Sequence, residues 1–409
     1  MNMNIPKLRF QEFNEFWKET KLKELGSFLG GGTPSTKEIS YWNGNIPWIS
    51  SSDITDENIF DIRKTRYITQ NAINKSATKI IPTGSVLIVS RVGVGKVAVN
   101  DVDICTSQDF TSIHLSNSNN IFIAYLIKNE TKKLLEFNQG TSIKGFVKSD
   151  LEELIINIPN IEEQNKIAHF LTSIDDKINL LKENKTLLEN YKKGVMQQIF
   201  TQEIRFKNEK GTYFKDWKEK TLGEIGKTFN GLTGKTKEDF GKGLPYIQYK
   251  QIFDNSTINI EKCDFVDVTE KDNQNKVQFG DVFFTVSSET PNEIGTASVL
   301  LDNVKEMYLN SFCFGYRSNS LKQLVPEFSR YLFRSELFRN DIVKLAQGST
   351  RYNMSKVELM KLKVMLPVEE EQIKIANFLF SIDEKIDLVN IQIAENQEYK
   401  KGLLQQMFI

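Results

Sequence analysis

Apolar side chains recur with an alternating spacing of four and three residues along two stretches of the chain. One series runs from Ile167 to Ile199 and the other from Ile375 to Met407. This spacing keeps an apolar stripe on one face of a helix, as in a coiled coil, so each series predicts one long helix. The seam residues expected to pair are Ile167, Leu171, Ile174, Ile178, Leu181, Leu188, Ile375, Leu379, Ile382, Ile386, Val389 and Ile393.

The two predicted helices are copies of one sequence. Residues 162–200 and 370–408 share 21 identical positions in 39 at a constant offset of 208. A helix of this length spans roughly 58 Å at about 1.5 Å per residue. Such a helix needs a partner to bury its seam, and the other copy is the obvious one.

Four polar residues interrupt the seams, namely Lys185, Lys192, Asn396 and Lys400. Polar seam positions often fix the register or the orientation of paired helices. Alternatively, these side chains reach past the seam into water at frayed helix ends. The sequence leaves both interpretations open.

The repetition extends into the segments that precede the helices. Trp17-Lys18-Glu19 returns as Trp217-Lys218-Glu219, at an offset of 200. The chain is therefore a tandem duplication in which the domains have diverged further than the helices. The expected organisation is a domain over residues 1–160, a central helix over 161–200, a second domain over 201–368 and a C-terminal helix over 369–409.

Both domains are predicted to be mixed α/β with strand-rich cores. Residues 85–90 and 281–286 are short apolar runs, each preceded by glycine, as strands entered from turns are. Helix-like stretches follow at 121–137 and 326–345. The predicted fold class is therefore mixed α/β, with two pseudo-symmetric α/β domains and two long paired helices.

Composition narrows the class of protein. Lys and Arg number 53, Asp and Glu also number 53, and this balance argues against a non-specific polyanion binder. Three scattered cysteines and two histidines argue against a disulfide framework or a zinc site. No apolar run approaches the roughly 18 residues of a membrane span, and the start lacks a secretory signal, so we expect a cytoplasmic protein without a membrane contact.

Positive charge is concentrated in the first domain. Residues 62–100 contain no acidic side chain and carry seven basic ones. This excess suits a track along DNA phosphates, and it also suits a solvated face whose acidic partners come from elsewhere in the fold. Residues 162–200 hold six acidic residues and six lysines, so the helices are too neutral to grip DNA and are expected to act as spacers.

Loops rich in hydroxyl, amide and basic side chains lie between the predicted elements of both domains. Such groups bind phosphate oxygens, and Arg, Lys, Gln and Asn can read base edges. The candidate DNA contacts of the first domain are Thr33, Ser35, Lys37, Ser51, Ser52, Arg63, Arg66, Arg91, Lys96, Thr141 and Lys144. Those of the second domain are Lys235, Lys237, Gln248, Lys250, Ser288, Thr350, Arg351 and Tyr352.

No catalytic motif emerges from the sequence. Gly93-Val94-Gly95-Lys96 lacks the spacing of a phosphate-binding loop and the hydroxyl residue after its lysine. Neither a dinucleotide fingerprint, nor an Asn-Pro-Pro-aromatic methylase tetrapeptide, nor a nuclease-like carboxylate pair is found. We expect no catalytic residue, metal or cofactor on this chain. The competing hypotheses are a methyltransferase or nuclease with an unrecognised active site, and a coiled-coil adaptor that does not read DNA.

The chain resembles the specificity subunit of type I restriction-modification systems over essentially its whole length. The second half has no match to the Gly-Gly-Thr-Pro-Ser motif of the first, so the resemblance assigns its DNA-facing loop less directly. The matching features are Gly31-Gly32-Thr33-Pro34-Ser35, Tyr41-Trp42, Ile46-Pro47-Trp48, Gly95-Lys96-Val97-Ala98, and the twice-used Glu-Gln-(two residues)-Ile-Ala-(one residue)-Phe-Leu at 163–171 and 371–379.

The resemblance implies a non-catalytic subunit with two target recognition domains placed head to tail around an antiparallel pair of helices. Each domain would read one half of a bipartite double-stranded DNA target, and the helices would set the spacer between the halves. Two methyltransferase subunits that modify adenine would dock on the helices and nearby surfaces, and restriction subunits would join through them. S-adenosylmethionine, ATP and Mg are then expected on those partner subunits.

Overall fold

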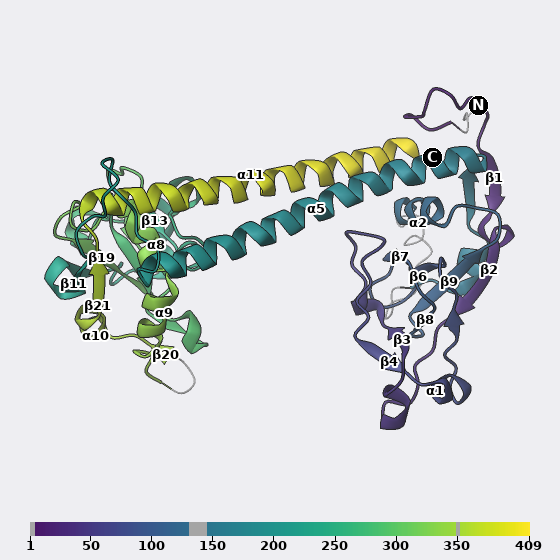
Figure 1. Ribbon diagram of the computed structural model, residues 1–409, viewed down its shortest axis with the longest axis horizontal. Helices are drawn as coiled ribbons and strands as arrows, with labels where there is room; N and C mark the ends of the chain where they lie inside the picture. The colour runs from purple at the N-terminus through teal and green to yellow at the C-terminus, as the bar shows by residue number, and fades with distance from the viewer. Residues whose placement is uncertain (1–4, 131–144, 349–351) are drawn as a thin grey trace. The chain divides into compact units, whose positions relative to one another are not determined.

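The computed structural model describes residues 5–130, 145–348 and 352–409, and the chain divides into two compact units. The first unit comprises Met1–Glu183 and Ile391–Ile409, and the second comprises Asn184–Asn390. Two long helices, α5 (Ile161–Phe200) and α11 (Glu369–Met407), each give one end to the first unit and the other end to the second (Figure 1). The mixed α/β class predicted from the sequence is confirmed.

The first unit is built on two four-stranded sheets (Figure 1). The antiparallel sheet has the order β2 (Gly26–Gly30), β9 (Phe110–Leu115), β6 (Val86–Val89) and β7 (Val97–Val99). The other sheet has the order β4 (Arg66–Ile68), β3 (Ile46–Ile49), β8 (Ile104–Thr106) and β5 (Ile80–Ile81), with β3 and β8 parallel. A further pair joins β1 (Lys18–Lys21) to β10 (Ile155–Ile158). The short helices are α1 (Gln70–Asn74), α2 (Asn120–Asn129) and α4 (Lys148–Glu152), with single turns at η1 (Leu22–Glu24), η2 (Ile39–Trp42) and η3 (Ser51–Asp53).

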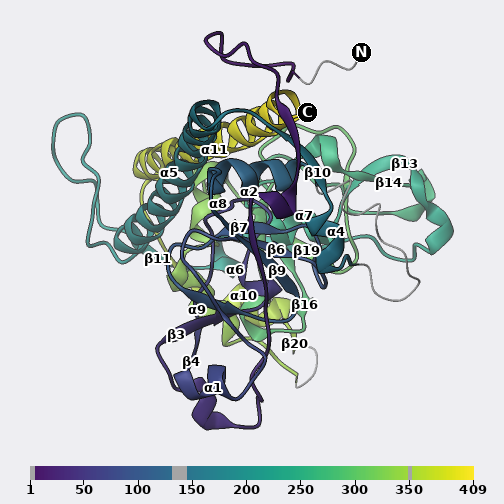
Figure 2. The same ribbon diagram turned by 90° about the vertical axis from the view of Figure 1, so that its right-hand side faces the viewer.

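The main core of the first unit lies between the antiparallel sheet, α2 and the long helices. It combines Trp17, Phe122 of α2 and Leu171 of α5 with Phe408 just beyond the end of α11. The segment before β1 passes this end of α11 (Figure 2), where the Leu8 amide donates a hydrogen bond of 2.9 Å to the Gln406 carbonyl. The α/β domain of the first unit, the start of α5 and the end of α11 therefore share one hydrophobic core.

The second unit repeats this plan with different additions. Its antiparallel sheet has the order β12 (Gly226–Asn230), β19 (Cys313–Ser318), β15 (Val282–Thr285) and β17 (Ala297–Val299). The other sheet has the order β14 (Asp264–Val266), β13 (Phe240–Ile247) and β18 (Tyr308–Leu309), and two-stranded pairs join β11 (Lys218–Thr221) to β21 (Lys363–Leu366) and β16 (Ser287–Ser288) to β20 (Tyr352–Asn353). The short helices are α6 (Leu222–Ile225), α7 (Tyr249–Asp254), α8 (Pro326–Leu332), α9 (Glu336–Val343) and α10 (Lys356–Lys361), with single turns at η4 (Lys237–Asp239), η5 (Ile260–Lys262), η6 (Glu270–Asp272) and η7 (Pro291–Glu293).

Within each unit the two long helices run antiparallel. In the first unit the start of α5, with Ile167 and Leu171, shares a core with Leu403 and Met407 near the end of α11. In the second unit the start of α11, with Ile375 and Leu379, shares a core with the end of α5. Their amphipathic pattern is therefore used as a helix–helix and helix–domain seam at both ends.

The seam residues differ in depth. Ile167, Leu171, Ile174, Ile178, Ile375, Leu379, Ile382 and Val389 are buried. Leu181, Leu188, Ile386 and Ile393 are only partly buried. The deeper residues thus gather mainly where a domain covers the first turns of each long helix.

The predicted strands and helices of the domains are reproduced with one difference. The runs at 85–90 and 281–286 form β6 and β15, and Gly84 and Gly280 before them adopt φ values of 75° and 84°. The single stretch at 326–345 is two helices, because Ser335 accepts a hydrogen bond from the Phe338 amide and starts α9 as its N-cap. The stretch at 121–137 contains α2, and its last residues lie outside the described part of the chain.

Candidate nucleic-acid interface

The loop after β2 in the first unit is pinned to the backbone beneath it. A Cβ atom on Gly31 or Gly32 would lie 2.0 or 2.5 Å from backbone atoms of neighbouring segments, so only glycine permits this approach. Trp48 donates from its indole to the Gly32 carbonyl at 2.9 Å, and Trp42 donates to the Ser35 carbonyl at 3.1 Å. The pinned loop presents Thr33, Ser35 and Lys37 as exposed side chains.

The turn η3 gathers further candidate residues of the first unit. Arg66 forms an ion pair with Asp53, donates to the Ser50 hydroxyl at 2.7 Å, and lies 4.6 Å from the centre of the Trp48 ring. Stacking on an aromatic face and pairing with a carboxylate both fix a guanidinium. Arg66 therefore has a framework role as well as a half-exposed surface.

Two other cations reach the same turn through its carbonyls. The Lys96 ammonium donates to the carbonyls of Ser51 and Ile54 at 3.2 and 3.1 Å. Arg63 donates to the Ser52 carbonyl at 3.3 Å. The fold thus brings Ser51, Ser52, Arg63, Arg66 and Lys96 together, although Ser51 itself is buried.

The hairpin between β6 and β7 places the remaining basic candidate at the surface. Its turn depends on Gly93 and Gly95, whose φ values of 83° and 94° favour glycine. Arg91 and Val92 are exposed at the start of this turn. This hairpin leads back to Lys96, so Arg91 extends the group around η3.

The cations of residues 62–100 fit both interpretations of their charge, because some pair with acidic side chains and others are exposed. Lys64 pairs with Asp101 at 2.5 Å, and Arg66 pairs with Asp53, so acidic partners do come from outside residues 62–100. The Lys64 ammonium lowers the pKa of the Asp101 carboxyl. Arg63 and Arg91 remain exposed. Lys75 and Lys79 are exposed as well, so the stretch keeps four exposed cations, of which Arg63 and Arg91 belong to the group around η3.

Lys235 and Lys237 of the second unit border a cavity of about 400 Å³ that Phe240, Tyr246 and Phe312 also line. Lys235 is held by Asp272 at 2.9 Å, and its side chain is only 8% exposed. Hydrogen bonds from the Thr269 amide and from Lys235 lower the pKa of the Asp272 carboxyl to about 2. Lys237 is exposed, so it is the freer of the two lysines.

Among the other candidates of the second unit, Ser288 lines a second cavity of about 450 Å³. Ser288 is buried, pairs in register with Tyr352 between β16 and β20, and donates to Glu293 at 2.9 Å. The Tyr249 hydroxyl donates to the Ser287 carbonyl at 2.9 Å. This cavity carries Glu289 and Glu293, so its surroundings are more acidic than those of η3.

Gln248 and Lys250 flank Tyr249 at the start of α7. Gln248 donates to the Lys262 carbonyl at 3.3 Å and is partly buried. Lys250 is exposed. The candidates Thr141, Lys144, Thr350 and Arg351 lie outside the described residues.

Sequence reasoning missed two residues at corresponding turns. Gln108 lies in the turn before β9 and accepts a hydrogen bond of 2.5 Å from the Thr33 hydroxyl. Phe312 lies in the turn before β19, is 59% exposed, and lines both of the cavities described above. A single amide or aromatic in a turn carries no local signal, and only the fold places these side chains among the other candidates.

The repeated Glu-Gln pair that opens each long helix has a structural role. Arg9 donates two hydrogen bonds of 2.7 Å to the buried Glu163 carboxylate, and the Trp17 indole donates a third at 3.3 Å. In the second unit Arg205 donates to Glu371 at 2.9 and 3.1 Å, and the Trp217 indole donates at 3.2 Å. The Glu163 carboxylate raises the pKa of the Arg9 guanidinium.

The glutamine of the pair joins each helix to its domain. Gln164 donates to the Pro159 carbonyl at 2.9 Å and accepts from the Asn119 amide at 2.9 Å. Gln372 donates to the Pro367 carbonyl at 3.0 Å and accepts from the Val325 amide at 2.9 Å. The signature recognised in the sequence is therefore the joint between a long helix and the segment before it.

Three aromatic rings repeat beside each joint. In the first unit Trp17, Phe122 and Phe408 contact one another at centroid distances of 5.3 to 6.4 Å. In the second unit Trp217, Phe328 and Phe200 do the same at 5.7 to 6.4 Å. The two frameworks are thus matched ring for ring.

Over residues 5–130, 145–348 and 352–409, no three His, Cys, Asp or Glu side chains are arranged to hold a metal ion. In the same ranges, none of the helices has both the length and the apolar composition needed to cross a bilayer.

The geometry defines a class of protein: a duplicated chain whose two units share one framework, are fastened to the same two helices, and present different polar loops. A family model described as "Type I restriction modification DNA specificity domain" matches residues 14–190 and again residues 214–397. The two matches together span most of the chain. The chain therefore belongs to the family of specificity subunits of type I restriction-modification systems.

Individual relatives agree with this assignment. The chain is 32% identical over 264 residues to the type I restriction enzyme MjaIX specificity subunit of Methanocaldococcus jannaschii, which covers 61% of each protein. It is 23% identical over 411 residues to the MjaVIII specificity subunit of that organism, covering 95% of this chain and 91% of the relative. It is 34% identical over 185 residues to the EcoR124I/EcoR124II specificity subunit of Escherichia coli, covering 43% of this chain and 45% of the relative.

Solved structures share the fold. The S subunit of a type I restriction-modification system from M. genitalium has a TM-score of 0.56 and 16% identity, with 99% of each chain covered. A chain from a structure on complex assembly and conformational transition of the type I R-M system has a TM-score of 0.61 and 18% identity, with 96% of each chain covered.

Proposed function

We propose that each unit reads one half of a bipartite double-stranded DNA target, and that the long helices set the unread spacer between the halves. The observation that carries the proposal is the combination of a repeated framework with unlike loops. The joints, the aromatic triads and the central sheet recur, whereas the exposed residues around η3 and around α7 do not correspond in charge or type. Two copies of one scaffold with different surface loops suit two different half-sites.

The first unit has the better equipped surface for DNA. Its exposed candidates Thr33, Ser35, Lys37, Ser52, Arg63 and Arg91 converge on the pinned loop, η3 and the β6–β7 turn. Hydroxyls and guanidiniums can hold phosphates, and an arginine can also read guanine in the major groove. In the second unit we assign this role to Lys237, Lys250 and the exposed Phe312, beside the partly buried Gln248 and Tyr352.

The chain itself is proposed to perform no chemistry. Two methyltransferase subunits would dock on the long helices and nearby surfaces, and restriction subunits would join through them. S-adenosylmethionine, ATP and Mg would then be bound by those subunits. The support is the family of the chain together with the absence of a methylase or nuclease motif from its sequence.

Mapping modified adenines across the genome, with and without this chain, tests the proposal. A bipartite motif that disappears with the chain is the expected result. Modification or cleavage of DNA by the purified chain alone would favour the methyltransferase or nuclease hypothesis. Protection of DNA by the complex without two separated half-sites would favour the adaptor hypothesis.

The spacer role has its own test. Adding or removing about one helical turn, roughly four residues, between Asn179 and Asn190 should change the length of the spacer and leave both half-sites intact. A changed half-site with an unchanged spacer would contradict the role assigned to the helices.

A further inference from the structure

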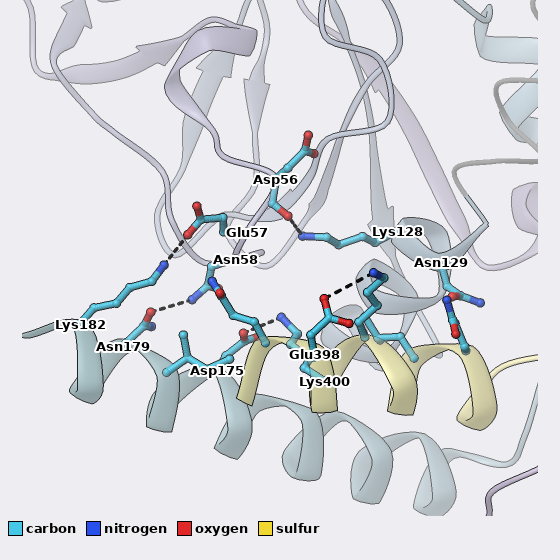
Figure 3. Close-up of a pocket in the computed structure, with 15 residues that line it drawn as sticks. Asp56, Glu57, Asn58, Lys128, Asn129, Asp175, Asn179, Lys182, Glu398 and Lys400 are labelled. Atoms are coloured by element: carbon cyan, nitrogen blue, oxygen red, sulfur yellow. Dashed lines mark hydrogen bonds and ion pairs between the residues drawn. The ribbon is translucent and has the colours of Figure 1, made fainter. Parts of the chain in front are cut away.

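A buried Tyr–Asp–Lys triad joins both long helices to the domain in the first unit. The Asp175 carboxylate of α5 accepts hydrogen bonds from the Lys400 ammonium of α11 and the Tyr125 hydroxyl of α2, both at 2.5 Å. The side chains of Lys400 and Asp175 are 7% and 2% exposed. Figure 3 shows Lys400 and Asp175 meeting between the helices, beside a cavity that Lys128 and Asn179 also line.

The second unit contains the same triad with the helices exchanged. Asp383 of α11 accepts from the Lys192 ammonium of α5, and from the Tyr331 hydroxyl of α8 at 2.8 Å. Arg330 adds a second cation at 3.2 Å from the same carboxylate. Each aspartate therefore bonds the opposite helix and its own domain at once.

The triads occupy equivalent places in the duplication. Asp175 and Asp383 differ by 208 positions, as do Lys192 and Lys400, and the lysine follows the aspartate by 17 positions on either helix. The long helices are identical at none of the ten positions from 181 to 190 and their counterparts, so the triads lie in the two retained ends and not in the diverged middle.

The other polar seam residues do not bridge the helices. Lys185 lies 3.8 Å from Glu189 on its own helix, and Asn396 donates to the Gln392 carbonyl of its own helix at 2.6 Å. Lys192 and Lys400 are thus the two polar seam residues that pair across the seam, and the remaining two serve as natural controls.

A buried ion pair adds little to the free energy of unfolding, but it can specify the register of two helices. Replacing both partners by apolar residues is often neutral or stabilising, whereas leaving one charge unpaired is strongly destabilising. The apolar seam alone tolerates a slip, because apolar side chains would meet apolar side chains again. A slip of one turn would exchange the Asp175 carboxylate beside Lys400 for Leu171 or Ile178, and so would strand a buried charge.

We propose that the two Tyr–Asp–Lys triads are register locks. They determine which turns of α5 lie beside which turns of α11, and they thereby restrict the protein to one spacer length. The tyrosines extend each lock to the domain, because Tyr125 and Tyr331 belong to helices whose other side chains form the domain cores. These residues act through the helices and touch no DNA, so they are positioning residues. The link to the spacer rests on the proposed function.

The test replaces both triads by apolar residues in the full chain, co-expressed with its methyltransferase partners. The changes are Tyr125→Phe, Asp175→Leu and Lys400→Leu, with Tyr331→Phe, Asp383→Leu, Lys192→Leu and Arg330→Met, so that no cation of either triad loses its carboxylate. The readout is methylation of DNA whose half-sites are separated by the natural spacer or by one base pair more or less. Discrimination between spacers should fall at least about tenfold, the effect of losing about 1.4 kcal/mol of register preference, with both half-sites unchanged.

Controls separate register from folding. The variant carrying Lys185→Met and Asn396→Leu removes the polar seam residues without a partner on the other helix, and should keep the discrimination of the natural protein. Thermal unfolding of the apolar triad variant should occur no lower than that of the natural protein. Unchanged spacer discrimination in this variant, whether or not it is destabilised, would overturn the proposal.

A second readout works without DNA. Spin labels on Leu180→Cys and Tyr399→Cys occupy exposed positions on α5 and α11 within the first unit, where the native cysteine is buried. The natural triad should give one distance between the labels, and the apolar triad should add populations displaced by roughly 5 Å, one helical turn. A single unchanged distance would refute the lock. If the natural protein shows no bipartite target while the labels do report a slip, the proposed function fails and the lock stands.

Discussion

The two units differ least where they hold the helices and most where they face outward. Glu163 and Glu371 each accept hydrogen bonds from an Arg and a Trp side chain. Trp17 and Trp217 each pack against two phenylalanine rings. By contrast, η3 of the first unit gathers arginines, while the α7 region of the second unit gathers tyrosine, buried serine and two glutamates. The comparison indicates one framework under constraint and two surfaces free to change.

The largest expected effect comes from the matched aromatic triads. Phe122→Ala and Phe328→Ala should each reduce the free energy of unfolding by about 3–5 kcal/mol, because each fully buried ring leaves a cavity. Hydrogen exchange followed by mass spectrometry can locate the loss. Each change should raise exchange mainly in its own unit. A loss confined to one unit for both changes would break the equivalence of the two frameworks.

The next effect comes from the helix joints. Arg9→Met and Arg205→Met should each cost about 3 kcal/mol, because Glu163 and Glu371 would remain as buried carboxylates without a cation. Denaturant unfolding measures the cost, and Trp217 reports on the second unit because the other three tryptophans, Trp17, Trp42 and Trp48, belong to the first. Adding Glu163→Leu to Arg9→Met should recover part of the stability. No recovery would show that the ion pair is not the cause.

A smaller effect should distinguish the outward surfaces. Arg63→Ala and Arg91→Ala should each weaken DNA binding by the complex about tenfold and lower the slope of log affinity against log salt by about 1, if each contacts one phosphate. Lys237→Ala and Lys250→Ala in the second unit should do the same or less, since its surface carries more acidic groups. Lys18→Gln, at an exposed position of β1 outside these loops, is the control. Equal affinity for all five proteins would remove the assignment of these cations.

The smallest effect concerns pH and compares Lys128 with Arg334, which lie at the same offset of 206 as Phe122 and Phe328. Burial, and then repulsion by Lys400, lowers the pKa of Lys128 to about 8, although Asp56, Glu57 and Asp175 oppose the shift. Because the unfolded chain keeps this lysine protonated to higher pH, the natural protein should gain stability relative to Lys128→Met as pH rises from about 8 toward 10.5. We expect a gain of about 1 kcal/mol, reduced by partial exposure of the side chain.

The matching change in the second unit supplies the contrast. Burial lowers the pKa of Arg334 only to about 10, so Arg334→Met should show no such dependence below that pH. Unfolding of both variants over this range checks the difference. A flat profile for Lys128→Met would mean that the lysine is solvated in the folded protein.

Much of the architecture followed from the sequence alone. The 4-3 spacing and the offset of 208 gave two paired helices, and the glycines before residues 85 and 281 marked β6 and β15. These patterns are local, because helix and strand periods are written in neighbouring residues. The surface candidates were harder, since the sequence could not separate exposed Arg91 from Lys96, whose ammonium is bound to carbonyls of η3.

The sequence by itself determined the duplication, the long helices and the mixed α/β class, since each depends on periodicity or repetition along the chain. Only the tertiary structure decided the partners of buried charges. Arg9 meets Glu163 across 154 residues, and Lys400 meets Asp175 across 225. No local pattern encodes such pairs, because a buried charge is stabilised by whichever opposite charge the complete fold brings to it. The polar seam residues, ambiguous in sequence, thereby became two interhelical bonds and two contacts within a single helix.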